Sequence, residues 1–218
     1  MWMRRADGSG DPTKLFNLDR GQTLLIPMAW APDGASIALL QLDLNTSSTD
    51  ILMLVRQPGS ETWTARPYLD SSANDDALRF SPDGKWVSFT SDVSGRQELY
   101  VQRFTGPGSG AEDASTGRTQ VSTGGAAGGG WWSADGKEIR YVDEELNALS
   151  VDVHCEPRFS VSMPKKLFDI RKYNYRSASY APDGRLLMVL KGENERASRI
   201  DLAVHFLDEL RGKLPASK

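Results

Sequence analysis

The sequence predicts an all-β protein, a β-propeller built from four-stranded antiparallel blades. Three observations predict it: a turn of the Pro-Asp-Gly type occurs four times, alternating apolar residues follow each turn, and the copies recur about every 50 residues. Self-similarity at such a period, carried by strands without helices between them, is typical of propellers. We expect about four complete blades plus a half-blade, belonging to a larger ring, and a short C-terminal α-helix.

The four turns share one chemistry. Proline at the second turn position fixes φ, aspartate hydrogen-bonds nearby backbone amides, and glycine adopts a positive φ. The motif is formed by Pro32, Asp33 and Gly34; by Pro82, Asp83 and Gly84; by Asp135 and Gly136, with Ala134 in place of proline; and by Pro182, Asp183 and Gly184. Each copy is predicted to join two strands as a tight hairpin, so these residues are interpreted as structural.

A bulky ring stands two positions before the proline, or before Ala134, in every repeat. The rings are Trp30, Phe80, Trp132 and Tyr180. After each glycine the third and fifth residues are apolar, and a period of two is the pattern of a half-buried strand. One ring per repeat predicts a repeated core layer of the blades.

Further β-like runs complete the repeats. Third runs begin at Asp50, Gln97, Asn147 and Arg199, and fourth runs begin at Thr62, Arg118 and Lys165. The predicted units of this single domain, residues 1–218, are the outer strands of a preceding blade over 2–17, blades over 28–70, 77–123 and 130–170, and a last blade over 177–206.

The two ends do not make a whole number of blades. Residues 2–17 offer two strands with none before them, and the last repeat offers three strands. Phe206, Leu207, Leu210 and Leu214 then recur at helical spacing, which predicts a helix over 203–214. We interpret the chain as the C-terminal part of a longer protein, whose end faces meet missing upstream blades or self-associate.

Composition excludes several classes of function. The formal net charge is -3 and no Lys/Arg stripe gathers, so we expect no nucleic-acid partner. No apolar run reaches about 18 residues and the N-terminus lacks the apolar segment of a signal peptide, so we expect no membrane contact by this chain itself. The glycine-rich stretches 105–117 and 123–130 lack the Gly-Lys-Ser/Thr of a P-loop and are interpreted as flexible blade connections.

Several residues suggest chemistry, and each has a simpler interpretation. Cys155, the single cysteine, is expected to be a half-buried strand residue, and His154 and His205 to be surface residues near the ends of third strands. The turn aspartates fall in separate blades and therefore form no calcium site. The pairs Asp75–Asp76 and Glu144–Glu145 are predicted to lie in solvated loops. The sequence thus predicts no catalytic residue, no metal ligand and no cofactor.

The repeats carry a family resemblance from about Trp30 to Phe206. The segment RFSPDGKWVSFTSDVSGRQELYVQRF resembles the WD-like β-propeller repeat of the TolB family. The order VSTGG, WWSADGKEIRYVD, KKLFDI, YAPDGRLLMVL and DELRGKLP is similar to the C-terminal propeller of bacterial transmembrane serine/threonine kinases. Kinase segments such as His-Arg-Asp and Asp-Phe-Gly are absent, so any kinase activity would belong to another part of the protein.

The resemblance and the residues leave three hypotheses for function. The first is a non-catalytic sensing module for a protein or small ligand, at the extracytoplasmic C-terminus of a bacterial receptor-type kinase. The second is a TolB-like periplasmic scaffold for envelope proteins. The third is an enzyme using the channel mouth, which requires a pocket that gathers ionisable side chains from several blades; the Gly-x-Ser-x-Gly elbow of a hydrolase does not occur.

Overall fold

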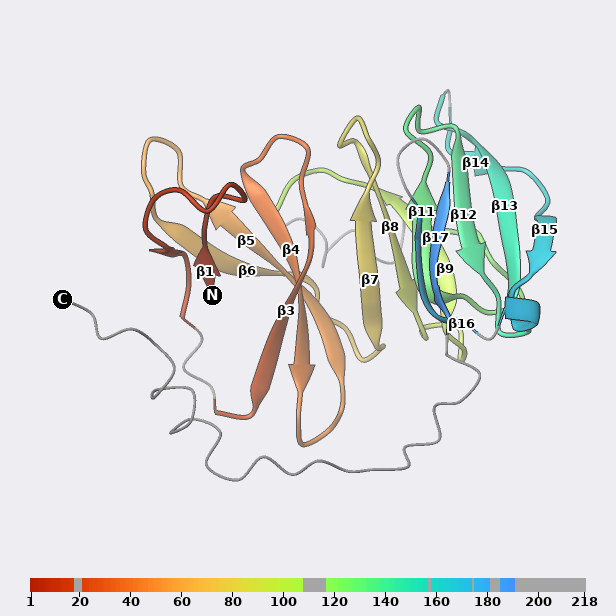
Figure 1. Ribbon diagram of the computed structural model, residues 1–218, viewed down its shortest axis with the longest axis horizontal. Coiled ribbons are helices and arrows are strands. Elements are labelled where there is room, and N and C mark those ends of the chain that lie inside the picture. Colours follow the sequence, from red (N-terminus) through yellow and green to blue (C-terminus); the bar gives the residue numbers. More distant parts are fainter. Residues whose placement is uncertain (18–20, 108–116, 157, 174, 181–184, 191–218) are drawn as a thin grey trace.

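The computed structural model describes residues 1–17, 21–107, 117–156, 158–173, 175–180 and 185–190, with backbone alone for 175–178 (Figure 1). The described strands form antiparallel sheets that follow one another along the chain, and the predicted all-β propeller fold is confirmed. The predicted helix over 203–214 and the turn at Pro182, Asp183 and Gly184 lie outside the described residues.

Two sheets have four strands in sequence order, and a third has five strands. The first blade consists of β3 (Thr23–Trp30), β4 (Ser36–Asp43), β5 (Thr49–Arg56) and β6 (Trp63–Leu69). The second consists of β7 (Asp75–Phe80), β8 (Trp86–Ser91), β9 (Glu98–Arg103) and β10 (Thr119–Gln120). The third consists of β11 (Ala127–Trp132), β12 (Glu138–Val142), β13 (Asn147–His154) and β15 (Lys165–Asp169), and β14 (Ser160–Val161) also pairs with β13.

Two-stranded units lie at the two ends of the described chain. Strands β1 (Trp2–Met3) and β2 (Thr13–Lys14) pair with each other, within the segment predicted as outer strands of a preceding blade. Strands β16 (Tyr175–Tyr180) and β17 (Leu186–Leu190) form the hairpin of the fourth repeat, after the 3-10 helix η1 (Ile170–Tyr173). In Figure 1 the orange, yellow and green sheets stand side by side, in the order of the sequence.

Neighbouring sheets pack face to face through alternating apolar side chains. In β4, Ala38 faces the second blade, whereas Ile37 and Leu39 face the β1–β2 unit, as the period of a strand requires. The second and third blades meet through Trp86, Leu99, Val101, Ile139, Tyr141 and Val151. Each such side chain that becomes fully buried contributes roughly 1.5–3 kcal/mol to stability.

The Pro-Asp-Gly turns have the expected local chemistry and also contact one another. Asp83 Oδ1 accepts hydrogen bonds from the Ser81 hydroxyl at 2.7 Å and from the Lys85 amide at 3.1 Å. The glycines of the three described turns adopt φ between 68° and 70°. A Cβ on Gly84 would lie 3.5 Å from the Pro32 ring, and one on Gly136 would lie 3.7 Å from the Pro82 ring. Successive turns therefore stack on one face of the molecule.

The first strand of every repeat contains a register irregularity shortly before its ring. The irregularities lie between Pro27 and Ala29, between Asp76 and Arg79, between Ala127 and Trp131, and between Tyr175 and Ser177. A bulge adds a residue to one strand and turns the following side chains. This repeated feature sets the direction of the side chains at the ends of the four first strands.

The glycine run before Trp131 is a strand and not the flexible connection that the sequence predicted. Ala127–Gly130 belong to β11, where Gly129 adopts φ +85°. A Cβ on Gly129 would lie 2.7 Å from the Cβ of Ala77 and 2.9 Å from its carbonyl oxygen. Ala77 lies in the bulge of β7 and has φ 54°. Glycine is used here because two bulged first strands touch.

Candidate binding groove

A groove of about 610 Å³ is lined by the ends of the first strands of four consecutive repeats. Strand β7 lies between β3 and β11 and contacts both, so these ends converge. The inner groove, as we call it, is lined by Met28, Ala29, Trp30, Pro32, Arg79, Phe80, Ser81, Pro82, Trp131, Trp132, Ser133, Ala134, Ser179 and Tyr180. Its wall is aromatic, with three serines and one charged side chain.

The four rings predicted as a core layer lie on the wall of the inner groove. Trp30 keeps 50% of its surface exposed, and its ring meets the Trp63 ring edge-on, with centroids 5.9 Å apart. Phe80, Trp132 and Tyr180 are partly buried. The bulges and the packing of the blades turn this layer toward the groove. The sequence shows that one ring recurs in each repeat, but it does not show which way the rings point.

Arg79 is the charged residue of the inner groove, and sequence reasoning missed it. Its guanidinium carbon lies 4.9 Å from the centroid of the Trp131 ring. Burial lowers the pKa of Arg79, and the nearby charge of Asp76 partly offsets this effect. Among the described residues, none accepts a hydrogen bond from this guanidinium or forms an ion pair with it. A partly buried cation with unused donors is suited to hold a carboxylate or another anion.

Arg79 ends a stack of side chains that crosses three repeats. The Trp131 and Tyr180 rings lie 5.5 Å apart, and the guanidinium carbon of Arg140 lies 5.3 Å from the Tyr180 centroid. Arg140 is held by Glu138 at 2.5 Å. Stacked arginines and rings keep planar surfaces in fixed positions, each contact worth roughly 0.5–2 kcal/mol. The wall beside Arg79 is therefore ordered before any ligand arrives.

A second groove of about 850 Å³ continues from the first between the second and third blades. The two share Ser81, Pro82, Trp132 and Ala134. The outer arm, as we call this second groove, is otherwise lined by Asp83, Asp135, Gly136, Lys137, Asp152, Val153, His154, Cys155 and Glu156. This continuity could not be predicted from the sequence, because it depends on which turns face one another.

His154 and Cys155 lie side by side in the chain at the end of β13, on the wall of the outer arm. His154 is exposed and Cys155 is partly buried with a free thiol. Burial raises the pKa of this thiol, and the charges of Asp83 and Glu156 raise it further. A thiol with a raised pKa is a weak nucleophile near neutral pH. His205, the other histidine, lies outside the described residues.

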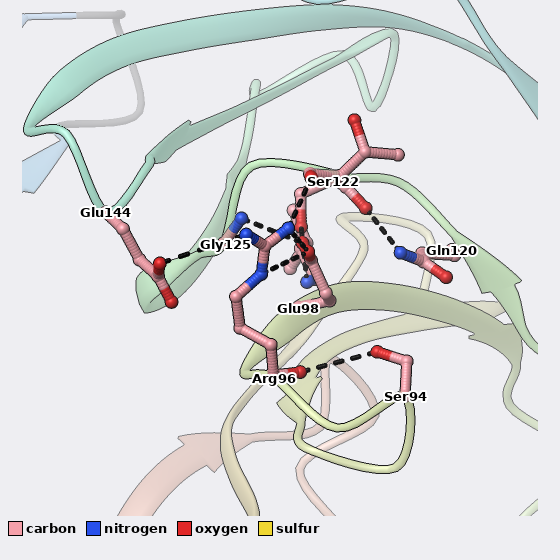
Figure 2. Close-up of polar contacts among 9 residues, drawn as sticks. Ser94, Arg96, Glu98, Gln120, Ser122, Gly125 and Glu144 are labelled. Carbon is pink, nitrogen blue, oxygen red and sulfur yellow. Dashed lines mark hydrogen bonds and ion pairs between the residues drawn. The ribbon is translucent and has the colours of Figure 1, made fainter.

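Figure 2 shows a cluster around the carboxylate of Glu98, at the start of β9. Glu98 accepts hydrogen bonds from the Ser122 hydroxyl and from the Gly125 amide at 3.1 Å, and it pairs with Arg96 at 2.5 Å. Arg96 also donates to the carbonyl of Thr123 and lies 4.0 Å from Glu144. These contacts join β9 to the segment that leads into the third blade, so the cluster is structural.

Asp75 and Asp76 do not lie in the solvated loop predicted from the sequence: both belong to β7, and Asp75 is 2% exposed. The Oδ1 atom of Asp75 has no hydrogen-bond partner among the described residues. Burial raises the pKa of Asp75 to about 6, although Ser91 and Arg118 act in the opposite direction. Glu144 and Glu145 do lie exposed in the turn after β12. Periodicity missed Asp75 because a polar residue at a strand end resembles a loop residue.

Asp75→Asn is expected to stabilise the protein by about 2 kcal/mol at pH 8 and to have little effect at pH 4. The reason is that the folded state binds the Asp75 proton more tightly than the unfolded chain. The protonated Asp75 carboxyl stabilises the folded protein fully below pH 3.8, the pKa of the group in the unfolded chain. This contribution is lost as the pH rises through about 6, the pKa in the folded protein. Urea unfolding across this range measures the effect, with Asp70→Asn, at an exposed site, as control. A gain in stability that did not change with pH would contradict the raised pKa of Asp75.

The described residues contain no group of three or more His, Cys, Asp or Glu side chains placed to hold a metal ion. In the same part of the chain, no helix has the length and apolar character needed to span a membrane.

Comparison with known proteins shows the fold. No family model matches the sequence. A proposed 6-phosphogluconolactonase from Bacteroides uniformis ATCC 8492 is 17% identical, with a TM-score of 0.52 over 87% of this chain and 56% of that chain. A proposed TolB from Agrobacterium tumefaciens is 18% identical, with a TM-score of 0.48 over 74% of this chain and 54% of that chain. TolB from Acinetobacter baumannii is 18% identical, with a TM-score of 0.38 over 88% of this chain and 54% of that chain.

This chain spans a little over half the length of each of these proteins. The likeness to the Bacteroides structure covers most of the described blades. Together with the three stacked antiparallel sheets, two of four strands and one of five, it shows that the chain has a propeller fold.

Proposed function

We propose that this chain is a non-catalytic binding module that holds an extended polypeptide segment in the inner groove. The observation that carries the proposal is Arg79, a partly buried cation without a hydrogen-bonded or ion-paired partner among the described residues, set among rings from four repeats. Aromatic-lined grooves suit extended and proline-rich segments, because rings contact apolar side chains while hydroxyls bond the backbone. A carboxylate of the segment would pair with Arg79.

The inner groove favours binding over catalysis. A hydrolase or lyase site needs a general acid or base within reach of the substrate, and a serine nucleophile needs such a base beside it. The lining holds Arg79 and three serines but no carboxylate and no histidine. The third hypothesis required ionisable groups from several blades. The inner groove has one, and among the ionisable residues of the outer arm only Asp83 comes from outside the third blade. Binding is therefore the better interpretation.

We propose the type of protein to which this module belongs from the order of the sequence motifs. Their similarity to the propellers of receptor kinases supports a sensing role at the extracytoplasmic end of a bacterial serine/threonine kinase. The alternative is a TolB-like periplasmic scaffold, supported by the repeat resemblance. The coding sequence upstream of Met1 distinguishes the two: a kinase and an apolar span favour the receptor, whereas a signal peptide followed by a small α/β domain favours the scaffold.

A random peptide library displayed on phage tests the binding function. We expect wild-type protein to enrich sequences in which Asp or Glu adjoins proline or an aromatic residue. Arg79→Gln is expected to weaken binding of the enriched peptides about 10- to 100-fold, because hydrogen bonds between charged groups are worth about 1.5–3 kcal/mol. Arg66→Gln, which changes an exposed arginine on β6, is the matched control and should leave the affinity unchanged.

The same preparations also test the enzyme alternative. No enriched motif, or motifs that bind Arg79→Gln as tightly as wild type, would contradict the proposal. Hydrolysis of 6-phosphogluconolactone that is lost in Arg79→Gln and kept in Arg66→Gln would favour an enzyme instead.

A further inference from the structure

We propose that the bound segment is bipolar: a carboxylate at one end pairs with Arg79, and lysine or arginine residues at the other end lie in the outer arm. This inference rests on the proposed function and adds the charge pattern and the direction of the partner segment.

The first step is that the inner groove and the outer arm form one path. They share Ser81 and Pro82 of the turn after β7, Trp132 at the end of β11, and Ala134 of the turn after β11. Trp132 is fixed at this junction, because its indole nitrogen donates to the Ser88 hydroxyl at 3.1 Å. A segment leaving the inner groove therefore passes over residues that also line the outer arm.

The second step is that the two parts of the path have opposite charge. The inner groove contains Arg79 and no carboxylate. The outer arm contains one lysine, Lys137, and four carboxylates, Asp83, Asp135, Asp152 and Glu156. An arrangement of this kind orients a charged segment, because the reversed direction places like charges together.

The third step is that the carboxylates of the outer arm differ in what they already contact. Asp83 and Asp135 cap their own turns, and Asp83 also lies 4.0 Å from Lys85. Asp152 and Glu156 are exposed, and within the described ranges neither takes part in an ion pair. These two residues are therefore the ones with which a basic segment would pair.

Fluorescence anisotropy with designed peptides tests the inference. All peptides carry the same head, Pro-Phe-Asp, and a Gly-Ser spacer, and they differ in a tail of three lysines or three glutamates. Wild-type protein is expected to bind the lysine-tailed peptide about tenfold more tightly, and the difference should narrow near 1 M salt, where the Debye length is about 3 Å. In Asp152→Lys/Glu156→Lys the preference should disappear or reverse.

Two controls keep the outcomes distinct. Glu61→Lys, in the exposed turn before β6, adds the same kind of charge away from the path and should keep the tail preference. Equal affinity for both tails, with binding still lost in Arg79→Gln, would overturn the bipolar segment and leave the proposed function standing. Failure of every peptide to bind would overturn both. A lysine preference that survives in Asp152→Lys/Glu156→Lys would also overturn the role of the outer arm.

Discussion

Replacing Gly129 with alanine is expected to destabilise the protein by about 3 kcal/mol and to lower its melting temperature by about 10 °C. Two effects add. The backbone at φ +85° is unfavourable for a residue with a Cβ, and the new Cβ would lie 2.7 Å from that of Ala77. Thermal unfolding followed by circular dichroism measures the change.

Gly95→Ala separates the two effects, because Gly95 has φ +90° and no atom of the described residues would lie within 4 Å of its Cβ. It should cost about 1 kcal/mol, from the backbone alone. Adding Ala77→Gly to Gly129→Ala should recover part of the loss, since it removes one of the colliding atoms. Equal losses in Gly129→Ala and Gly95→Ala would show that the first strands of the second and third blades do not touch as described.

Glu98→Ala is expected to cost about 3 kcal/mol of unfolding free energy, because it removes a shared acceptor from a buried position. The Gly125 amide and the Ser122 hydroxyl lose their partner, and the Arg96 guanidinium loses its closest anion. We expect the loss to be smaller than for a fully buried ion pair, since the Arg96 side chain is 46% exposed. Urea unfolding at neutral pH measures it.

The matched control for this substitution is Glu144→Ala. Glu144 is the second carboxylate near Arg96, at 4.0 Å, and its side chain is 53% exposed. Removing it should change stability by about 0.5 kcal/mol or less. Similar losses in Glu98→Ala and Glu144→Ala would mean that Glu98 does not hold the segment between the second and third blades.

The blades could be predicted from the sequence because their signals are local. The turn at Asp83 depends on residues within the turn, and the alternation along β8 places Val87 and Phe89 together on the face that packs against the first blade. Two predictions from the sequence are wrong. The glycines before Trp131 lie in β11 and not in a flexible connection, because neighbouring strands touch there. Asp75 is buried at the start of β7 and does not lie in a loop.

The sequence by itself determined the all-β repeat, the hairpins and the presence of one ring in each repeat, since each depends on residues within a few positions of one another. Only the tertiary structure decided where those rings point, that Arg79 stands among them without a hydrogen-bonded or ion-paired partner among the described residues, and that an acidic arm continues the groove. These features arise where strand ends from separate blades converge. Bulge direction and the angle between sheets depend on contacts between residues far apart in the chain, and no local pattern encodes those contacts.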